Sequence, residues 1–151
     1  MVVSVNSIED FVRESNEIER IFRDPSQAEI DELKRFMNLS VITIDELKRF
    51  VSVYQPDAML RDQYGLNVKV GHYYPPYGGP KIRQLLEELL KKDLNTFNLH
   101  VQYELIHPFT DGNGRSGRAL WAWKNKELKG GFLLNFYYQT LENNEGIRCL
   151  S

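Results

Sequence analysis

The chain has 151 residues, with 19 basic and 21 acidic side chains and a formal net charge of −2. This length suits one domain with a core of its own, and the near-zero charge argues against a protein that binds DNA or RNA mainly through phosphates, so we expect no nucleic-acid partner. The one cysteine, Cys149, excludes an internal disulfide and any zinc site that needs several thiolates. The sequence has no apolar run of membrane-spanning length and no signal-peptide pattern after Met1, so we expect a cytoplasmic protein with no membrane contact.

The first part of the chain predicts three amphipathic helices. Apolar residues recur at helical spacing between Ser7, a candidate N-cap, and Pro25, where we expect the first helix to end. We expect the second helix to begin near Ser26. The third is expected to begin at Thr43, because Thr43 and Glu46 form a capping-box pattern.

The heptapeptide IDELKRF occurs twice, at residues 30–36 and again at residues 44–50. A solenoid needs at least about three stacked units, and the chain has no third copy. We therefore interpret the two copies as two ordinary amphipathic helices with similar sequences.

The pattern changes between Gln55 and Pro80. Residues 66–71 alternate between apolar and polar side chains, which is the period of a strand, and glycines and prolines interrupt the segment. This predicts a short β-hairpin followed by a loop. A hairpin of this size is marginal alone, so we expect it to pack on the helices or to act as a lid.

Helical patterns return after Pro80. They predict a helix with apolar residues from 82 to 90, a second from about Asn95 to Ile106, a third from Arg115 to about Glu127, and a last one over 132–141. The predicted fold class is therefore mainly α with one short β-hairpin, and no linker divides the chain.

The side chains that point to chemistry lie in residues 107–118, HPFTDGNGRSGR, between two predicted helices. The backbone amides of Gly112, Asn113 and Gly114 are expected to lie at a helix N-terminus without intrahelical partners, where they favour an anion. Arg115 and Arg118 are three residues apart on one face and can hold phosphate oxygens.

Two further residues of this segment suit phosphate chemistry. Asp111 offers a hard oxygen ligand beside the anion site, which fits magnesium held by one carboxylate and phosphates. His107 is a candidate general base. Because all these residues fall within twelve positions, packing alone does not explain them.

The segment matches the signature of Fic proteins, His-x-Phe-x-(Asp/Glu)-Gly-Asn-(Gly/Lys)-Arg, and its extension to Arg118. Residues 70–76 resemble the flap hairpin of that family, and residues 137–141 resemble its closing helix. The resemblance implies a Fic-type helical bundle with one short β-hairpin flap. It implies a single Fic domain over 1–151, with an N-terminal helix in 1–24 and the Fic core in 43–145.

Fic proteins transfer AMP from ATP to a hydroxyl of a target protein with magnesium. The resemblance therefore implies a Mg²⁺-dependent protein adenylyltransferase that binds ATP and a target with a Ser, Thr or Tyr hydroxyl, self-modification included. It implies that His107 is the general base, that Phe109 anchors the loop and that Asp111 holds Mg²⁺. The residues it implies for ATP binding are Gly112, Asn113, Gly114, Arg115, Arg118, Val70, Gly71, His72, Tyr73, Tyr137 and Asn144.

Residues 15–20 resemble the inhibitory motif of one class of the family, (Ser/Thr)-x-x-x-Glu-(Gly/Asn), with Ser15 and Glu19 in the matching positions. By resemblance, Glu19 pairs with Arg118 and keeps the γ-phosphate of ATP from its productive place. The chain departs from the motif at Arg20, where Gly or Asn is expected.

Other functions stay open from the sequence. The same fold can transfer another phosphate-containing group or remove AMP from a modified target, although the Lys of the Doc-type kinases is replaced here by Gly114. A toxin-like binding module is a further alternative, and a helix-turn-helix regulator is disfavoured by the charge. The sequence leaves open the target protein and the oligomeric state, a homo-oligomer included.

Overall fold

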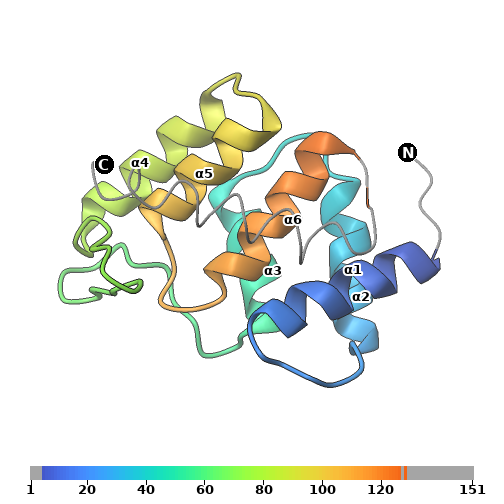
Figure 1. The fold of residues 1–151 in the computed structure, drawn as a ribbon. Coiled ribbons are helices and arrows are strands. Elements are labelled where there is room, and N and C mark those ends of the chain that lie inside the picture. Colours follow the sequence, from blue (N-terminus) through green and yellow to red (C-terminus); the bar gives the residue numbers. More distant parts are fainter. Residues whose placement is uncertain (1–4, 127, 129–151) are drawn as a thin grey trace.

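A computed structural model of the chain describes residues 5–126 and 128. This part of the chain forms helices joined by loops: α1 (Val5–Ile18), α2 (Gln27–Met37), α3 (Ile44–Tyr54), α4 (Pro80–Lys91), α5 (Thr96–Ile106) and α6 (Asn113–Asn125). Helix α6 contacts α1, α2, α3 and α5, and Figure 1 shows it between the α4–α5 pair and α1 with α2. None of the described helices is both long and apolar enough to cross a membrane. The helix predicted over 132–141, and with it Tyr137 and Asn144, lies outside the described residues.

Three helices begin where the sequence predicts, and a side chain caps each of them. Ser26 is the N-cap of α2 and forms a full capping box with Glu29. Thr43 caps α3 by accepting a hydrogen bond from the amide of Glu46, and Asn95 caps α5 in the same way. The three predicted helix starts are confirmed. Among the three, the cap itself is predicted only at Thr43, because capping depends on residues three positions apart, which the sequence shows directly.

The bounds of α1 differ from the prediction. The helix begins before Ser7, so Ser7 does not cap it. It also ends at Ile18, well ahead of Pro25, because Arg20 takes up a left-handed backbone conformation with φ 63°. A single left-handed residue ends a right-handed helix as effectively as a proline does.

The predicted strand over 66–71 is wrong. The described residues contain isolated β-bridges but no strand, and the hairpin is present only as a tight turn in which Val70 and Tyr73 exchange both backbone hydrogen bonds, at 2.9 and 2.8 Å. Gly71, with φ 59°, occupies the first tip position. The next hydrogen-bonded pair of a longer ladder would need a backbone N–H at position 75, and Pro75 has none. We call residues 62–79 the 62–79 loop.

The two copies of IDELKRF lie on α2 and α3 and pack against each other. The phenylalanines that close the two copies lie with their ring centroids 5.2 Å apart. The arginine of each copy contacts the glutamate of the other, Arg35 with Glu46 at 2.5 Å and Arg49 with Glu32 at 3.3 Å. The contacts are thus reciprocal, as in a two-fold pair.

A buried histidine joins α5 to α6. His100 is 3% exposed, and its Nδ1 lies 2.9 Å from the carbonyl oxygen of Gly117. Because a carbonyl only accepts, Nδ1 carries the proton. Burial, reinforced by the charge of Arg118, lowers the pKa of His100 from 6.5 to about 4, although the hydrogen bond to Gly117 opposes the change. The carboxylate of Glu104 also lies close to Gly117, on the same side as the imidazole.

This histidine predicts an acid-dependent loss of stability. Above pH 6.5 the imidazole is neutral in both the folded and the unfolded chain. As the pH falls from 6.5 toward 4 only the unfolded chain gains the proton, so the free energy of unfolding falls. The two pKa values correspond to a loss of about 3 kcal/mol. Urea unfolding across this range measures it.

The matched variants for this experiment are His100→Gln and His72→Gln. His100→Gln is expected to flatten the decrease between pH 6.5 and 4, whereas His72→Gln, which changes an exposed side chain, should leave it unchanged. An equal slope in His100→Gln and the parent protein would contradict the prediction.

Candidate active site

The sequence motif forms the connection between α5 and α6. His107 is the C-cap of α5 in a left-handed conformation with φ 50°, and Gly112, with φ 78°, is the N-cap of α6. Asn113 closes the loop between them: its Oδ1 accepts from the Phe109 amide at 2.9 Å, and its Nδ2 donates to the Phe109 carbonyl at 2.7 Å. Since Phe109 is 1% exposed, this loop is anchored in the core.

The N-terminal turn of α6 has the properties of an anion site. The helix starts at Asn113, two residues earlier than predicted, and no side chain caps it. Its first amides therefore have no intrahelical partner, and the helix dipole adds partial positive charge there. The side chain of Asn113 is committed to Phe109, so Asn113 offers only its backbone amide to a ligand.

Asp111 lies exposed just before this turn. One of its carboxylate oxygens accepts a hydrogen bond from the Gly112 amide at 2.7 Å. Among the described residues no group of three His, Cys, Asp or Glu side chains could hold a metal ion. An exposed carboxylate beside an anion site fits a cation that Asp111 would hold together with oxygens of a bound phosphate, as proteins often hold magnesium.

Arg118 is buried and is bound by the end of α1. Its Nε donates to Ser15 Oγ at 2.8 Å, and its Nη2 donates to the Ser15 carbonyl at 2.9 Å and to Glu19 Oε2 at 2.5 Å. Arg118 is 1% exposed and the Glu19 side chain 38%. The structure thus brings Ser15, Glu19 and Arg118 together, across about a hundred residues of sequence.

The carboxylate of Glu19 lies next to Gly114 in the first turn of α6. A Cβ atom added to Gly114 would collide with Glu19 Oε2 and would lie 3.1 Å from Arg118 Nη1. The carboxylate therefore lies directly against the first turn of α6. Because a carboxylate and a phosphate are attracted by the same amides and the same guanidinium, the two would compete for this place.

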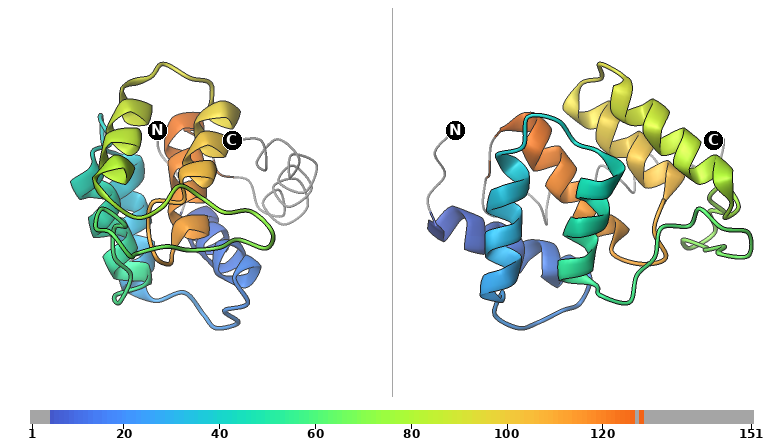
Figure 2. Two further views of the ribbon diagram at one scale, coloured as in Figure 1. Left: turned by 90° about the vertical axis from the view of Figure 1, so that its left-hand side faces the viewer. Right: turned by 180° about the vertical axis from the view of Figure 1, so that it is seen from behind.

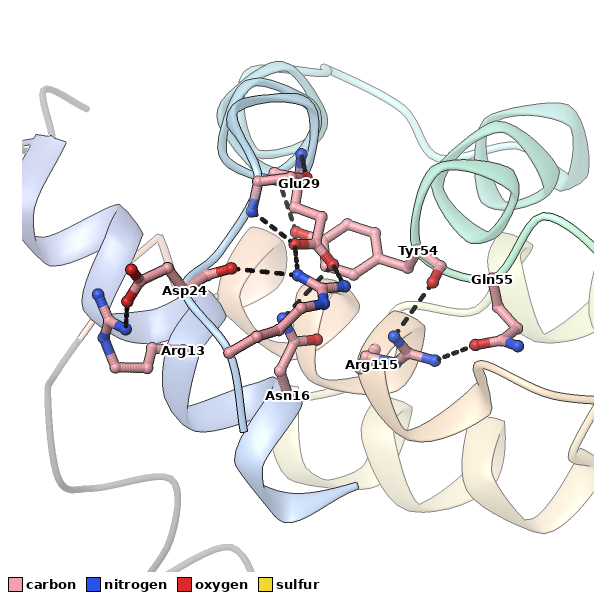
Figure 3. Close-up of polar contacts among 9 residues, drawn as sticks. Arg13, Asn16, Asp24, Glu29, Tyr54, Gln55 and Arg115 are labelled. Carbon is pink, nitrogen blue, oxygen red and sulfur yellow. Dashed lines mark hydrogen bonds and ion pairs between the residues drawn. The ribbon is translucent and has the colours of Figure 1, made fainter. Parts of the chain in front are cut away.

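Arg115 points to a different part of the molecule. It is buried, its Nη1 donates to the Tyr54 carbonyl at 3.2 Å, and its Nη2 donates to Gln55 Oε1 at 2.8 Å (Figure 3). Burial lowers its pKa. In this structure Arg115 holds the end of α3, and its predicted contact with phosphate stays a prediction.

Val70, Gly71, His72 and Tyr73, which are also predicted to contact ATP, lie in the 62–79 loop, which Figure 2 shows in green beside the α5–α6 connection. Gly71 and His72 are exposed at the tip of its tight turn. Tyr73 is buried, and its hydroxyl donates to the Leu105 carbonyl at 2.6 Å. Val70 is half-buried, so this part of the loop is tied to the end of α5 and leaves its tip open.

A network that the sequence did not predict holds the end of α1 in place. Glu29, 1% exposed, accepts two hydrogen bonds from Arg23, at 2.8 and 3.1 Å, and one from Asn16 at 3.4 Å. Burial raises the pKa of Glu29, but the hydrogen bonds from Arg23 and Ser26 outweigh it and lower the pKa overall. Figure 3 shows Asn16, Glu29, Tyr54 and Arg115 in succession between α1 and α6.

The conformation of Arg20 shows what the departure from the inhibitory motif at this position does to the structure. Its side chain is exposed, so its size does not hold α1 away from the site. Its φ of 63° is the position where glycine or asparagine is favoured, because other L-residues pay roughly 1–2 kcal/mol there. The departure therefore costs stability at the turn that follows Glu19.

We predict that Arg20→Gly raises the free energy of unfolding by about 0.5–1 kcal/mol, since relief of the left-handed strain exceeds the added freedom of the unfolded chain. The matched control is Glu17→Gly, which places glycine inside α1 and should lower stability by about the same amount. Urea unfolding measures both. Equal signs for the two variants would contradict the prediction.

The fold and the site together define a helical protein with an anion site at a helix N-terminus and a histidine at the end of the preceding helix. Comparison with known protein families matches residues 13–123 to the Fic/DOC family. The chain belongs to the Fic/DOC family, and the match includes both the 107–118 motif and residues 15–19. Membership supports a general role as a transferase.

Proposed function

We propose that the chain is a magnesium-dependent protein adenylyltransferase that moves AMP from ATP to a Ser, Thr or Tyr hydroxyl of a protein. The observation that carries the proposal is the anion site at the start of α6, where free amides and the Arg118 guanidinium meet. A triphosphate suits this site because it offers several anionic oxygens to both kinds of donor. Its α-phosphate would then lie near the loop that carries His107.

The reaction requires a general base and groups that stabilise negative charge. His107 would accept the proton of the incoming hydroxyl, whose oxygen bonds to the α-phosphorus while the bond to the β-phosphate bridge breaks and pyrophosphate leaves. The backbone amides of Asn113 and Gly114 would stabilise the charge that develops on the phosphate oxygens, whereas the Gly112 amide donates to Asp111 in this structure. Phe109 and Asn113 would keep the loop, and with it His107, in a fixed place.

Magnesium bound by Asp111 would neutralise charge shared by two phosphates. Asp111 suits this role because it is exposed and one of its oxygens is fixed by Gly112. The other ligands would come from the nucleotide and from water.

The same geometry supports inhibition by α1. Glu19 occupies the place beside Gly114 and Arg118 that a terminal phosphate would need. ATP could enter with its last phosphate displaced, and the α-phosphate would then present the wrong angle to the hydroxyl. Two residues of α1 keep Glu19 in this place: Ser15 accepts a hydrogen bond from Arg118, and Asn16 donates one to Glu29.

Labelled ATP tests the proposal. The chain is incubated with Mg²⁺ and with ATP labelled on either the α- or the γ-phosphate, alone and with a cell lysate, and protein-bound label is counted. Adenylyl transfer predicts α-label only and a mass gain of one AMP on the modified protein. Transfer of γ-label would indicate a kinase, and loss of AMP from a previously modified target without transfer would indicate a de-adenylylating enzyme. Absence of ATP binding by calorimetry would favour a binding module.

A further inference from the structure

Arg61 is a fully buried cation whose hydrogen-bond partners are backbone carbonyls. It is 0% exposed. Its Nε donates to the His107 carbonyl at 2.7 Å, and its Nη2 donates to the Ile106 carbonyl at 2.9 Å. Its Nη1 donates to the carbonyls of Leu66 and Pro76, at 3.1 and 2.9 Å. One guanidinium therefore holds the end of α5 and both arms of the 62–79 loop.

The backbone of Arg61 makes the same connection. Its amide donates to the Pro108 carbonyl at 2.8 Å, and its own carbonyl accepts from the Gly79 amide at 2.9 Å. The preceding residue, Leu60, forms a β-bridge with Phe109. Residues 60–61 thus lie side by side with the motif loop and also fix the end of the 62–79 loop.

The end of α5 has a physical need for such a donor. The last carbonyls of a helix have no intrahelical partner and carry partial negative charge, so a cation is favourable there. The carbonyls at 105, 106, 107 and 108 accept, in order, from the Tyr73 hydroxyl, from Arg61 Nη2, from Arg61 Nε and from the Arg61 amide. Each of these donors belongs to the 62–79 loop or to the residue before it.

We infer that Arg61 is a positioning residue that couples the 62–79 loop to His107, so that a shift of the loop is transmitted to the backbone of the base. Its planar fork can bind two chain segments in fixed directions, which the point charge of a lysine cannot do. The catalytic part of the inference rests on the proposed function, because the position of His107 matters for AMP transfer. The coupling itself does not depend on the reaction.

Amide hydrogen exchange of the protein without nucleotide tests the coupling. Two reporter amides are suitable: that of Gly79 at the end of the 62–79 loop, and that of Thr110 in the motif loop, which donates to the Met59 carbonyl at 2.8 Å. In Arg61→Lys we expect both to exchange about tenfold faster, while the amides of α2 and α3 keep their rates. The control is Arg35→Lys, which weakens the ion pairs of Arg35 with Glu32 in α2 and with Glu46 in α3 and should leave both reporters unchanged.

If Arg61→Lys does not fold, Tyr73→Phe replaces it, since it removes only the hydroxyl that donates to Leu105. It should speed exchange in the 62–79 loop and in the 105–110 segment together. In either variant, faster exchange in only one of the two segments, or in neither, overturns the inference.

Enzyme kinetics test whether Arg61 affects catalysis through His107. In a Glu19→Gly background, Arg61→Lys should lower kcat for AMP transfer about thirtyfold, with the KM for ATP changed less than about threefold, because Arg61 touches the His107 backbone and no part of the anion site. A rise in KM with kcat unchanged would refute a positioning role. If Glu19→Gly itself transfers nothing, the proposed function fails, whereas the exchange experiment still decides the coupling.

Discussion

Replacing Glu19 is expected to raise the rate of AMP transfer by about ten- to a hundredfold. The estimate follows from the hydrogen bond between Glu19 and the buried Arg118, since a bond to a charged group contributes roughly 1.5–3 kcal/mol and each 1.4 kcal/mol is a factor of ten. Glu19→Gly removes the side chain, and Glu19→Gln removes only its charge. Glu19→Gly should free the place beside Gly114 for a phosphate, and Glu19→Gln should weaken the hold of the side chain on that place by removing the charge that pairs with Arg118. The rate of both variants is measured with α-labelled ATP.

The control for this experiment is Glu17→Gln, which removes a neighbouring carboxylate of α1 that does not contact Arg118. Its activity should equal that of the parent protein. The comparison of the two Glu19 variants separates the charge of the side chain from its volume: a gain in Glu19→Gly but not in Glu19→Gln would mean that the side chain blocks the place beside Gly114 by its volume and not by its charge. No gain in either variant would disprove inhibition by Glu19.

Loss of the His107 imidazole is expected to reduce AMP transfer by roughly 10²–10⁴-fold, the usual contribution of a general base. The variant to use is His107→Asn in the Glu19→Gly background. His107 has φ 50°, and asparagine tolerates this conformation better than alanine, so the loop geometry is kept while the base is lost. The rate is measured with α-labelled ATP at saturating nucleotide.

Nucleotide binding serves as the internal control for the His107 variant. The amides of the α6 N-terminus and Arg118 are untouched, so the Kd for ATP should change by less than about threefold. A variant that binds ATP normally and transfers AMP at the parental rate would exclude His107 as the base. A variant that loses ATP binding would show instead that His107 supports the anion site.

The parts of the fold that could be predicted are those set by nearby residues. Ser26 and Asn95 start helices because their side chains reach amides three positions on, and the anion site at Gly112 follows from small residues in front of a helix. The pair of Glu19 and Arg118 was expected only by resemblance to a family. No local pattern connects two residues 99 positions apart.

What could not be predicted depends on contacts between distant segments. The side chain of Arg61 reaches carbonyls about 45 residues away, and in the sequence it is one of many arginines. The carboxylate of Glu29 completes the capping box with Ser26, and it also binds Asn16 at the end of α1, which no pattern in the sequence indicates. The alternation over 66–71 was misleading because Pro75, outside the window, removes the amide that a partner strand would need.

The reciprocal packing of α2 on α3 has a consequence for assembly. Because the same heptapeptide lies on both helices and each copy contacts the other in the same way, the surface formed by residues 30–36 and 44–50 is self-complementary. Either helix would make the same contacts with the matching helix of a second molecule. What favours the intramolecular pair is the short connection over residues 38–43, which gives an effective concentration in the millimolar range. Lengthening or straining that connection is thus a route to a domain-swapped dimer.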